Sequence, residues 1–419
     1  MACLLPCIIN LSRSKKLNKK LTKYLGPLEG SIQITGSKSE SNRLLILQQF
    51  YKNLEIKNLG NSDDAQLMQK ALSSHEIEID INHAGTAMRF LTAYFSVTEG
   101  RETTLTGSKR MKERPIKILV DALRSLGADI QYLGNDGFPP LKIVGKKLRE
   151  NKVVIDGGVS SQYISALLLI APSLDQGLIL EFKGKITSIP YIKMTLGLLC
   201  EIGIESNWEG NTIVVKPLNE IKNSVITVES DWSSASYYYS LAALSPEATI
   251  TLNSYKKSSL QGDAVLAKIY EHFGVKTVFK NESITLIKEN TTRQLLPLSL
   301  DLKNAPDIAQ TIAVTCFGLG ISCDLSGLHT LKIKETDRLV ALKNELEKLG
   351  GEVEITDKSL HLKASKIIRE NILISTYHDH RMAMAFAPLI LKTTLLIEDA
   401  EVVSKSYPDY WNDIEKLTT

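Results

Sequence analysis

The chain has 419 residues, and this length predicts two or three domains rather than a single core. Apolar residues make up 43% and charged residues 23% of the sequence, which is typical of a soluble globular protein. A net charge of +3 argues against a general attraction to nucleic acid or to a membrane, so any anion binding must depend on local clusters of cations.

The N-terminal part of the chain contains two features. Residues 1–26 hold a short apolar run followed by basic residues, the reverse of a secretory signal, and we interpret them as a strand or a loosely ordered extension. Residues 35–43 then combine one glycine, three serines, Lys38 and Arg43 before an apolar run. This pattern predicts a loop that enters a helix N-terminus and binds an anion, most plausibly phosphate. An ordinary capped helix with solvated charges would explain this stretch taken alone.

Short polar or small-residue openings recur along the chain, and each is followed by a mostly apolar segment. The steps between the first residues of these openings are 45, 74, 73, 74 and 73 residues. Segments that are apolar nearly all round predict buried helices. Their openings begin at Ser41, Thr86, Ser160, Ser233, Asp307 and His380.

A second series of segments lies between the first and mixes charged with apolar residues at helical spacing. It predicts amphipathic surface helices, several of which end on a glycine, as at Gly127 and Gly350. Short β-rich runs between the helices predict strands at 152–155, 212–215, 249–252, 277–279 and 395–397. Six units of about 73 residues, the first truncated, would then fill the chain. The amphipathic segments begin at Asp63, Pro115, Ile189, Gly262, Lys334 and Tyr407.

The openings and the loops near them carry residue types that bind anions, which apolar packing does not require. Ser160, Ser161 and Gln162 offer hydroxyl and amide donors at the third opening. Cations at repeat-equivalent helix starts suit two polyanionic small molecules held together. These cations are Lys38, Arg43, Arg89, Arg114, Lys334, Arg338, Arg381 and Lys405.

Two carboxylates lie among the cations. Asp307 is expected at a helix N-cap, where it is either only a cap or a general base aimed into a cationic pocket. Lys334 and Arg338 are four residues apart and are expected on one helix face, with Glu335 one position around. Alternatively, these charged residues only form the solvated first turn of a helix and have no role in a site. The residues therefore predict a transferase-like site that joins two anionic substrates.

Seven motifs follow one another in order within residues 31–410. They are GSKS at 36–39, AGTAMR at 84–89, RPI at 114–116, SSQ at 160–162, PD at 306–307, KETDR at 334–338 and DHRMAM at 379–384. Together they resemble the 5-enolpyruvylshikimate-3-phosphate synthase family. This resemblance implies an α/β fold of two similar domains, each with three βαβαββ units around buried parallel helices, an inside-out α/β barrel. The expected domains are 37–229, and 1–36 with 230–419, the N-terminal strand pairing with the second domain and the chain crossing twice.

The resemblance also implies the reaction. The enolpyruvyl group of phosphoenolpyruvate would pass to the 5-hydroxyl of shikimate 3-phosphate, with loss of phosphate. Asp307 would take the hydroxyl proton, Glu335 would protonate the methylene carbon, and Lys38 would assist at the bridging oxygen. Shikimate 3-phosphate would be held by Lys38, Ser39, Arg43, Ser160, Ser161, Gln162, Ser188, Tyr191, Asp307 and Lys334.

Phosphoenolpyruvate has its own implied set of residues, drawn from both halves of the chain. The resemblance implies no metal and no cofactor, and His378 and His380 lack a third and fourth ligand. We expect a cytoplasmic monomer whose partners are its small-molecule substrates, with neither nucleic acid nor a membrane. The residues implied for phosphoenolpyruvate are Lys38, Gly85, Arg114, Gln162, Arg338, Arg381 and Lys405.

Two other functions remain open at this point. The first is the sister enolpyruvyl transferase that acts on UDP-N-acetylglucosamine, whose loop typically carries a reactive cysteine, whereas Cys200 and Cys316 fall in expected helices. The second is a non-catalytic phosphate- or RNA-binding protein, although few aromatic residues stand beside the basic ones. Four positions depart from the usual pattern of the family. They are His83, Phe90, Trp232 and Thr330.

Overall fold

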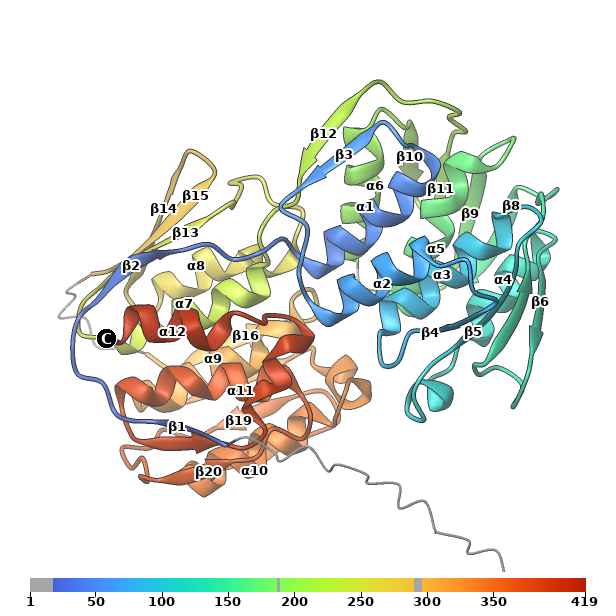
Figure 1. The fold of residues 1–419 in the computed structure, drawn as a ribbon. Coiled ribbons are helices and arrows are strands. Elements are labelled where there is room, and N and C mark those ends of the chain that lie inside the picture. The colour runs from blue at the N-terminus through green and yellow to red at the C-terminus, as the bar shows by residue number, and fades with distance from the viewer. Residues whose placement is uncertain (1–17, 187–188, 290–295) are drawn as a thin grey trace, which may run out of the picture.

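The computed structural model describes residues 18–186, 189–289 and 296–419, and it has two lobes (Figure 1). The N-terminal lobe has a hydrophobic core built from residues between 44 and 228. The C-terminal lobe has a second core, built from residues 21–34 and from residues between 232 and 417. The division into domains at 37–229 stays a prediction, with which these two cores agree. In the described part of the chain no helix is both long and apolar enough to cross a membrane.

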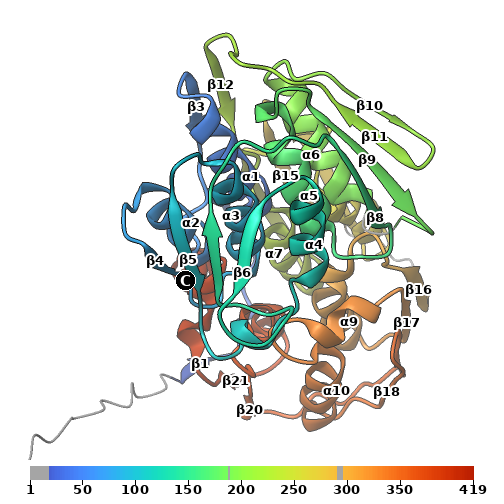
Figure 2. The same ribbon diagram turned by 90° about the vertical axis from the view of Figure 1, so that its right-hand side faces the viewer.

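The six expected buried helices are present, three in each lobe. In the N-terminal lobe α1, α3 and α5 pack against one another, with the sheets outside them (Figure 2). All 13 residues of α7 are buried, because this helix is apolar or small on every side. The bounds are α1 Lys38–Phe50, α3 Gly85–Val97, α5 Ser161–Ile170, α7 Trp232–Leu244, α9 Ala309–Leu319 and α11 His380–Phe386.

The six amphipathic helices are also present, and Gly127 and Gly350 follow two of them with φ of +103° and +106°. Four of them begin later than expected, α4 at Lys117, α8 at Leu266, α10 at Arg338 and α12 at Tyr410. Residue 334 does not begin α10, because the Asp337 side chain accepts hydrogen bonds from the backbone of Leu339 and Val340 and starts the helix at residue 338. The bounds are α2 Asp63–Ser73, α4 Lys117–Ser125, α6 Ile189–Glu201, α8 Leu266–Glu271, α10 Arg338–Leu349 and α12 Tyr410–Leu417.

Short 3-10 helices join several of these elements. Of these, η3 begins at Gly262, where the sequence places the start of an amphipathic segment, and η4 contains Asp307, the first residue of the fifth opening. The backbone of Lys334, just after η5, is extended. The bounds are η1 Met111–Glu113, η2 Ala171–Ser173, η3 Gly262–Val265, η4 Pro306–Ile308, η5 His329–Ile333, η6 Ala387–Leu391 and η7 Ala400–Lys405.

The sheets of the N-terminal lobe show the expected βαβαββ unit. In the unit from β4 to β7 the sheet order is β4-β5-β7-β6, with the first pair parallel and the others antiparallel. The unit from β8 to β11 repeats this pattern. The bounds are β3 Leu54–Lys57, β4 Glu78–Asp80, β5 Glu102–Thr106, β6 Asp129–Tyr132, β7 Leu141–Val144, β8 Lys152–Asp156, β9 Leu178–Lys183, β10 Ser206–Glu209, β11 Thr212–Val215 and β12 Ser224–Thr227.

The C-terminal lobe contains one complete unit, β16 to β19, and two that take a strand from the N-terminus. Strand β2 pairs in parallel with β13, and β1 pairs antiparallel with β21, as expected for the N-terminal strand. The five strands predicted from the sequence lie within β8, β11, β13, β14 and β21. The bounds are β1 Lys19–Leu21, β2 Leu28–Ile32, β13 Ala248–Asn253, β14 Val275–Lys280, β15 Ser283–Lys288, β16 Leu298–Asp301, β17 Cys323–Ser326, β18 Val353–Ile355, β19 Leu360–Leu362, β20 Ile372–Ile374 and β21 Leu395–Ile397.

The two lobes are joined where the chain crosses between them. A bridge between Gly36 and Ser230 pairs the outgoing and returning segments. Strand β12 returns beside β3 and pairs with it in parallel. Among the described residues the strands form six separate sheets, and these sheets lie around the buried helices of each lobe without closing into one barrel. Helices α1 and α7 begin directly after the two crossing segments.

Candidate active site

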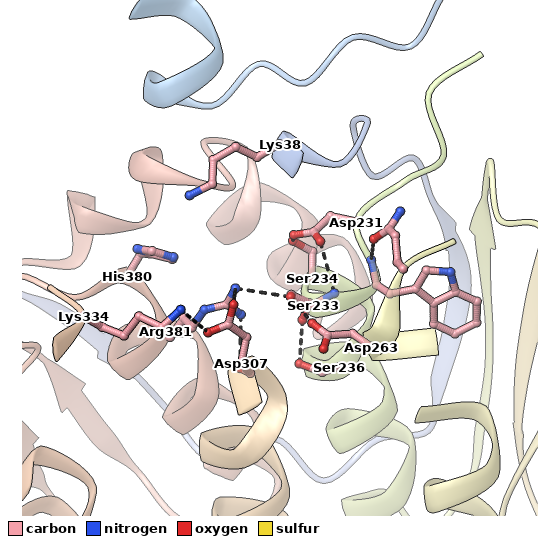
Figure 3. A network of polar contacts seen from close by, with 12 residues as sticks. Lys38, Asp231, Ser233, Ser234, Ser236, Asp263, Asp307, Lys334, His380 and Arg381 are labelled. Atoms are coloured by element: carbon pink, nitrogen blue, oxygen red, sulfur yellow. Dashed lines mark hydrogen bonds and ion pairs between the residues drawn. The ribbon is translucent and has the colours of Figure 1, made fainter. Parts of the chain in front are cut away.

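The candidate site is built from helix starts of both lobes. Lys38 is the first residue of α1 in the N-terminal lobe, and it points towards the group of residues around Asp307 (Figure 3). Asp307 lies in η4 of the C-terminal lobe, Arg338 begins α10 and Arg381 lies in the first turn of α11. The repeated helices thus bring together residues that are far apart in sequence.

Three cations surround the carboxylate of Asp307. Its Oδ1 atom lies 2.9 Å from Nη1 of Arg338 and 3.4 Å from Nζ of Lys334, and its Oδ2 atom lies 3.4 Å from Nη2 of Arg381. The N-cap of η4 is Ala305, so Asp307 does not stand at the cap position where it was expected. Of the two alternatives for Asp307, a carboxylate aimed into a cationic pocket is the one that the geometry favours.

Arg338 is deeply buried in the site, with 2% of its surface exposed. Its guanidinium reaches three carboxylates: Nε donates to Asp379 at 2.7 Å, Nη2 to Glu335 at 2.8 Å and Nη1 to Asp307 at 2.9 Å. Asp379 also caps α11 by accepting from the backbone of Arg381 at 2.9 Å. A planar fork with donors on several edges suits this arrangement, which a single ammonium group could not reproduce.

The charges of the site displace the pKa values of its carboxyl groups. Burial raises the pKa of Asp307, but the charges of Arg381, Lys334 and Arg338 outweigh burial and hold it well below the ordinary value. Burial likewise opposes ionisation of Glu335, and Arg338 leads the charges that lower its pKa well below normal. Both groups are therefore carboxylates at neutral pH before any substrate binds.

Lys38 and His380 are two further titratable groups of the site. The ammonium group of Lys38 lies 3.6 Å from the carboxylate of Asp64. Burial lowers the pKa of Lys38, whereas Asp64 and Glu335 raise it, and the net result is a raised pKa that keeps the ammonium charged. Burial lowers the pKa of His380 well below its ordinary value, so this ring is neutral at pH 7.

The expected residues of the second and third openings lie together in the N-terminal lobe. A Cβ atom at Gly85 would lie 2.4 Å from Nη1 of Arg114, so a glycine is needed for the guanidinium to pack there. Nε2 of Gln162 donates to Oγ1 of Thr86 at 3.2 Å. The hydroxyl of Ser160 caps α5 by accepting from the backbone of Gln162, and Ser161 is the first residue of that helix.

Arg43 is held by the protein itself. Its guanidinium donates to Oγ1 of Thr195 at 2.8 Å, to Oγ of Ser165 at 2.9 Å and to the carbonyl of Ser39 at 2.6 Å. It also lies under the ring of Tyr191, 6.0 Å from the ring centroid. These contacts fix the positions of Arg43 and Tyr191 relative to α1.

Three other expected residues have different surroundings. Arg89 is buried and donates to the carbonyls of Pro115 at 2.7 Å and Gly85 at 3.3 Å, which gives it partners within its own lobe. Lys405 lies in η7 and donates to the carbonyl of His378 at 2.7 Å. The remaining one, at position 188, lies outside the described residues.

Sequence reasoning missed several carboxylates of this region. Asp64 faces Lys38, Asp379 faces Arg338, and Asp263 accepts a hydrogen bond from the hydroxyl of Ser233. A signal for two of them was present, since Asp64 and Asp263 stand at the starts of the second helix series, as Glu335 does beside Lys334. Those starts alternate along the chain with the openings that carry the cations.

A model of the EPSP synthase (3-phosphoshikimate 1-carboxyvinyltransferase) family matches residues 70–414. The chain belongs to this family. It is 46% identical to the 3-phosphoshikimate 1-carboxyvinyltransferase of Bacteroides fragilis strain YCH46 over 393 residues, which cover 93% of this chain and 95% of that relative. The relative of the same name from Colwellia psychrerythraea is 36% identical over 424 residues, 94% of this chain and 98% of its own.

Solved structures show the same fold. EPSP synthase from Acinetobacter baumannii superposes with a TM-score of 0.77 at 21% identity and covers 95% of this chain and 98% of its own. The enolpyruvyl transferase NikO from Streptomyces tendae superposes with a TM-score of 0.71 at 14% identity, covering 95% and 97%. The fold class expected from the resemblance, α/β with similar repeated units, is confirmed by these likenesses.

Proposed function

We propose that this chain is a 3-phosphoshikimate 1-carboxyvinyltransferase. It transfers the enolpyruvyl group of phosphoenolpyruvate to the 5-hydroxyl of shikimate 3-phosphate and releases phosphate, a step of the shikimate pathway to chorismate and the aromatic amino acids. The observation that carries this proposal is the meeting of Asp307 and Glu335 with three cations at one place, opposite Lys38. The names of its relatives support the same conclusion.

The roles of the two carboxylates follow from their positions. Asp307 is the general base that takes the proton of the 5-hydroxyl, and Glu335 is the general acid that protonates the methylene carbon of phosphoenolpyruvate. Protonation creates an oxocarbenium-like centre, and the fixed charges of the site stabilise it without reorganising. Lys38, which stays protonated, assists at the bridging oxygen as phosphate leaves. The methyl group formed by protonation returns a proton to Glu335 in the same elimination, which restores the enol double bond.

Substrate binding is also what makes the carboxyl groups reactive. The same cations that hold the pKa values of Asp307 and Glu335 low are those proposed to bind the phosphate and carboxylate groups of the substrates. Anions placed among these cations cancel part of their field, so the pKa of both groups rises on binding. A higher pKa makes Asp307 a stronger base and allows Glu335 to carry a proton. The reaction then proceeds only when both substrates are bound.

The remaining residues divide between the two substrates. Shikimate 3-phosphate lies against Lys38, Ser39, Arg43, Ser160, Ser161, Gln162, Ser188, Tyr191, Asp307 and Lys334. Phosphoenolpyruvate lies against Lys38, Gly85, Arg114, Gln162, Arg338, Arg381 and Lys405. The contact of Gly85 with Arg114 and the cluster around Asp307 support this division. We further propose that the protein works as a monomer in the cytoplasm.

The test is an assay of phosphate release. Phosphate should appear only when shikimate 3-phosphate and phosphoenolpyruvate are both present, and EDTA should leave the rate unchanged because fixed side-chain cations supply the charge. Loss of activity with EDTA that a divalent metal restores would contradict this mechanism. Turnover with UDP-N-acetylglucosamine in place of shikimate 3-phosphate, or salt-dependent retention on RNA without turnover, would favour the alternative functions instead.

A further inference from the structure

The carboxyl group of Asp263 lies beside the site, and the proposed reaction does not use it. Asp263 is the second residue of η3, and 8% of its surface is exposed. Its Oδ2 atom accepts a hydrogen bond from the hydroxyl of Ser233, in the first turn of α7 (Figure 3). A Cβ atom at Gly262 would lie 2.6 Å from the carbonyl of Asn304, so glycine lets η3 approach the loop that carries Asp307.

The hydrogen bond from Ser233 decides which way its hydroxyl points. A serine hydroxyl has one proton, and Ser233 donates it in the hydrogen bond to Asp263. The oxygen of Ser233 can then only accept further hydrogen bonds, through its lone pairs. Nη2 of Arg381 lies 3.2 Å from this oxygen and donates to it. The other terminal nitrogen of Arg381 donates to the carbonyl of Asp307 at 3.2 Å. A continuous chain of contacts therefore leads from Asp263 through Ser233 to Arg381.

Helix capping does not explain why a carboxyl group stands at this position. The start of α7 already has its cap, because Asp231 accepts from the backbone of Ser233 at 3.2 Å and from the hydroxyl of Ser234 at 2.9 Å. Among the described residues no cation lies within ion-pair distance of Asp263. Burial, and next the negative charge of Asp307, raise the pKa of Asp263 to about 7, which means that placing this carboxyl here costs folding free energy.

We infer that Asp263 is a positioning residue for Arg381. It holds the hydroxyl of Ser233 as an acceptor, and this fixes one edge of the Arg381 guanidinium while the other edges face Asp307 and the phosphoenolpyruvate subsite. The inference rests on the proposed function, in which Arg381 binds phosphoenolpyruvate. Without Asp263 the hydroxyl is free to rotate and present its proton to Arg381, and the guanidinium loses its alignment with the anion.

Steady-state kinetics of four variants test the inference. Asp263→Ala should raise KM for phosphoenolpyruvate about tenfold, the effect of one hydrogen bond to a charged group. KM for shikimate 3-phosphate, and its binding measured by calorimetry, should stay as in wild type. Ser233→Ala should match Asp263→Ala, whereas Asp263→Asn, which keeps an acceptor oxygen, should restore most of the affinity. Ser234→Ala is the matched control, because its hydroxyl contacts Asp231, and it should behave as wild type.

The outcomes separate this inference from the proposed function. A wild-type protein that releases no phosphate with both substrates contradicts the proposed function. An active wild type whose KM for phosphoenolpyruvate is unchanged in both Asp263→Ala and Ser233→Ala overturns the inference alone. An equal rise of both KM values, or an Asp263→Asn variant as impaired as Asp263→Ala, overturns it as well, since these results indicate a merely structural role. If Asp263→Ala does not fold, Ser233→Ala decides by the same criterion.

Discussion

A single buried side chain connects the carboxylates of the site. The guanidinium of Arg338 contacts Asp307, Glu335 and Asp379, and it lies at the start of a helix rather than on its exposed face. Removing one partner of a buried charge costs more than the pair contributes, because the other charge is left uncompensated. The site therefore behaves as one unit, and changes at its carboxylates act both on chemistry and on the arrangement of the cations.

The first prediction concerns the two proposed acid–base residues. Asp307→Ala and Glu335→Ala should each lower kcat at least about 100-fold, the usual contribution of one general acid or base. Glu335→Ala should still bind shikimate 3-phosphate in calorimetry. Glu352→Ala, which removes an exposed carboxylate of the same lobe, is the control. A variant of Asp307 or Glu335 that turns over like wild type would limit that residue to a structural role.

The second prediction concerns what Glu40, at the crossing between the lobes, contributes to the pH dependence of stability. Glu40 is buried and accepts from the backbone of Glu229 and from Gln261. Burial first, and then the charge of Glu229, raise its pKa from 4.5 to about 7. Because the folded state holds the proton more tightly, the contribution of Glu40 to the free energy of unfolding falls as pH rises from 4.5 to 7, by roughly 3 kcal/mol for these two values.

Glu40→Gln tests this sign. The variant lacks the titrating group, so relative to wild type it should gain stability between pH 5 and pH 8, measured as the difference between the two thermal midpoints at each pH. Glu76→Gln, at an exposed position, should show no such change. An identical pH dependence of Glu40→Gln and wild type would show that Glu40 ionises in the folded protein as it does in the unfolded chain.

At the scale of elements, helix starts determine where the charges lie. Asp337 accepts from the backbone of Leu339 at 3.1 Å and of Val340 at 3.2 Å, which makes Arg338 the first residue of α10. Arg338 is then directed into the lobe, and Lys334 reaches Asp307 from an extended segment. A cap thus decides the geometry of two cations that bind the same carboxylate.

The third prediction follows from this cap. Asp337→Ala should lower the stability of the C-terminal lobe by about 1 kcal/mol, the usual cost of a lost N-cap. It should also lower kcat/KM, because Arg338 stands at the frayed end of the helix. Asp337→Ser keeps an acceptor and should restore most of both losses. Thermal unfolding and steady-state kinetics measure the two effects. Unchanged kinetics in a destabilised Asp337→Ala variant would show that the cap stabilises the helix but does not position Arg338 for catalysis.

At the scale of the whole molecule, side chains of the two lobes also contact one another away from the bridge between Gly36 and Ser230. Asn61 donates to Asp409 at 3.0 Å, and the hydroxyl of Ser404 donates to Asp63 at 3.1 Å, which joins the start of α2 to the C-terminal lobe. Both lobes present cations to the site. Facing cations repel, and an anion between them turns this repulsion into attraction, so ligand binding favours the closed arrangement.

The fourth prediction is that the enzyme closes on shikimate 3-phosphate. The radius of gyration from small-angle X-ray scattering should fall when this ligand alone is added. Shikimate without the phosphate is the control and should cause a smaller change, because it brings less negative charge between the lobes. A radius of gyration that is unchanged at saturating shikimate 3-phosphate would contradict closure, and catalysis would then need no such movement.

The sequence alone was sufficient for the features that depend on neighbouring residues. The six buried helices follow from apolar segments at a regular step, and the left-handed glycines Gly127 and Gly350 follow from helix ends. Local patterns determine these features because helix burial, capping and turns involve residues only a few positions apart. The motifs around Lys38, Asp307 and Arg381 also pointed to the family, since their order along the chain needs no knowledge of the fold.

Only the tertiary structure decided which charged groups meet. Asp379 and Arg338 are 41 residues apart, and Asp263 and Ser233 are 30 apart, so no local periodicity relates them. The expected shared helix face of Lys334 and Arg338 was wrong because the Asp337 side chain competed successfully for the helix start. The partners of a side chain depend on how repeated units pack against one another, and packing brings together the helix ends of different units regardless of their distance in sequence.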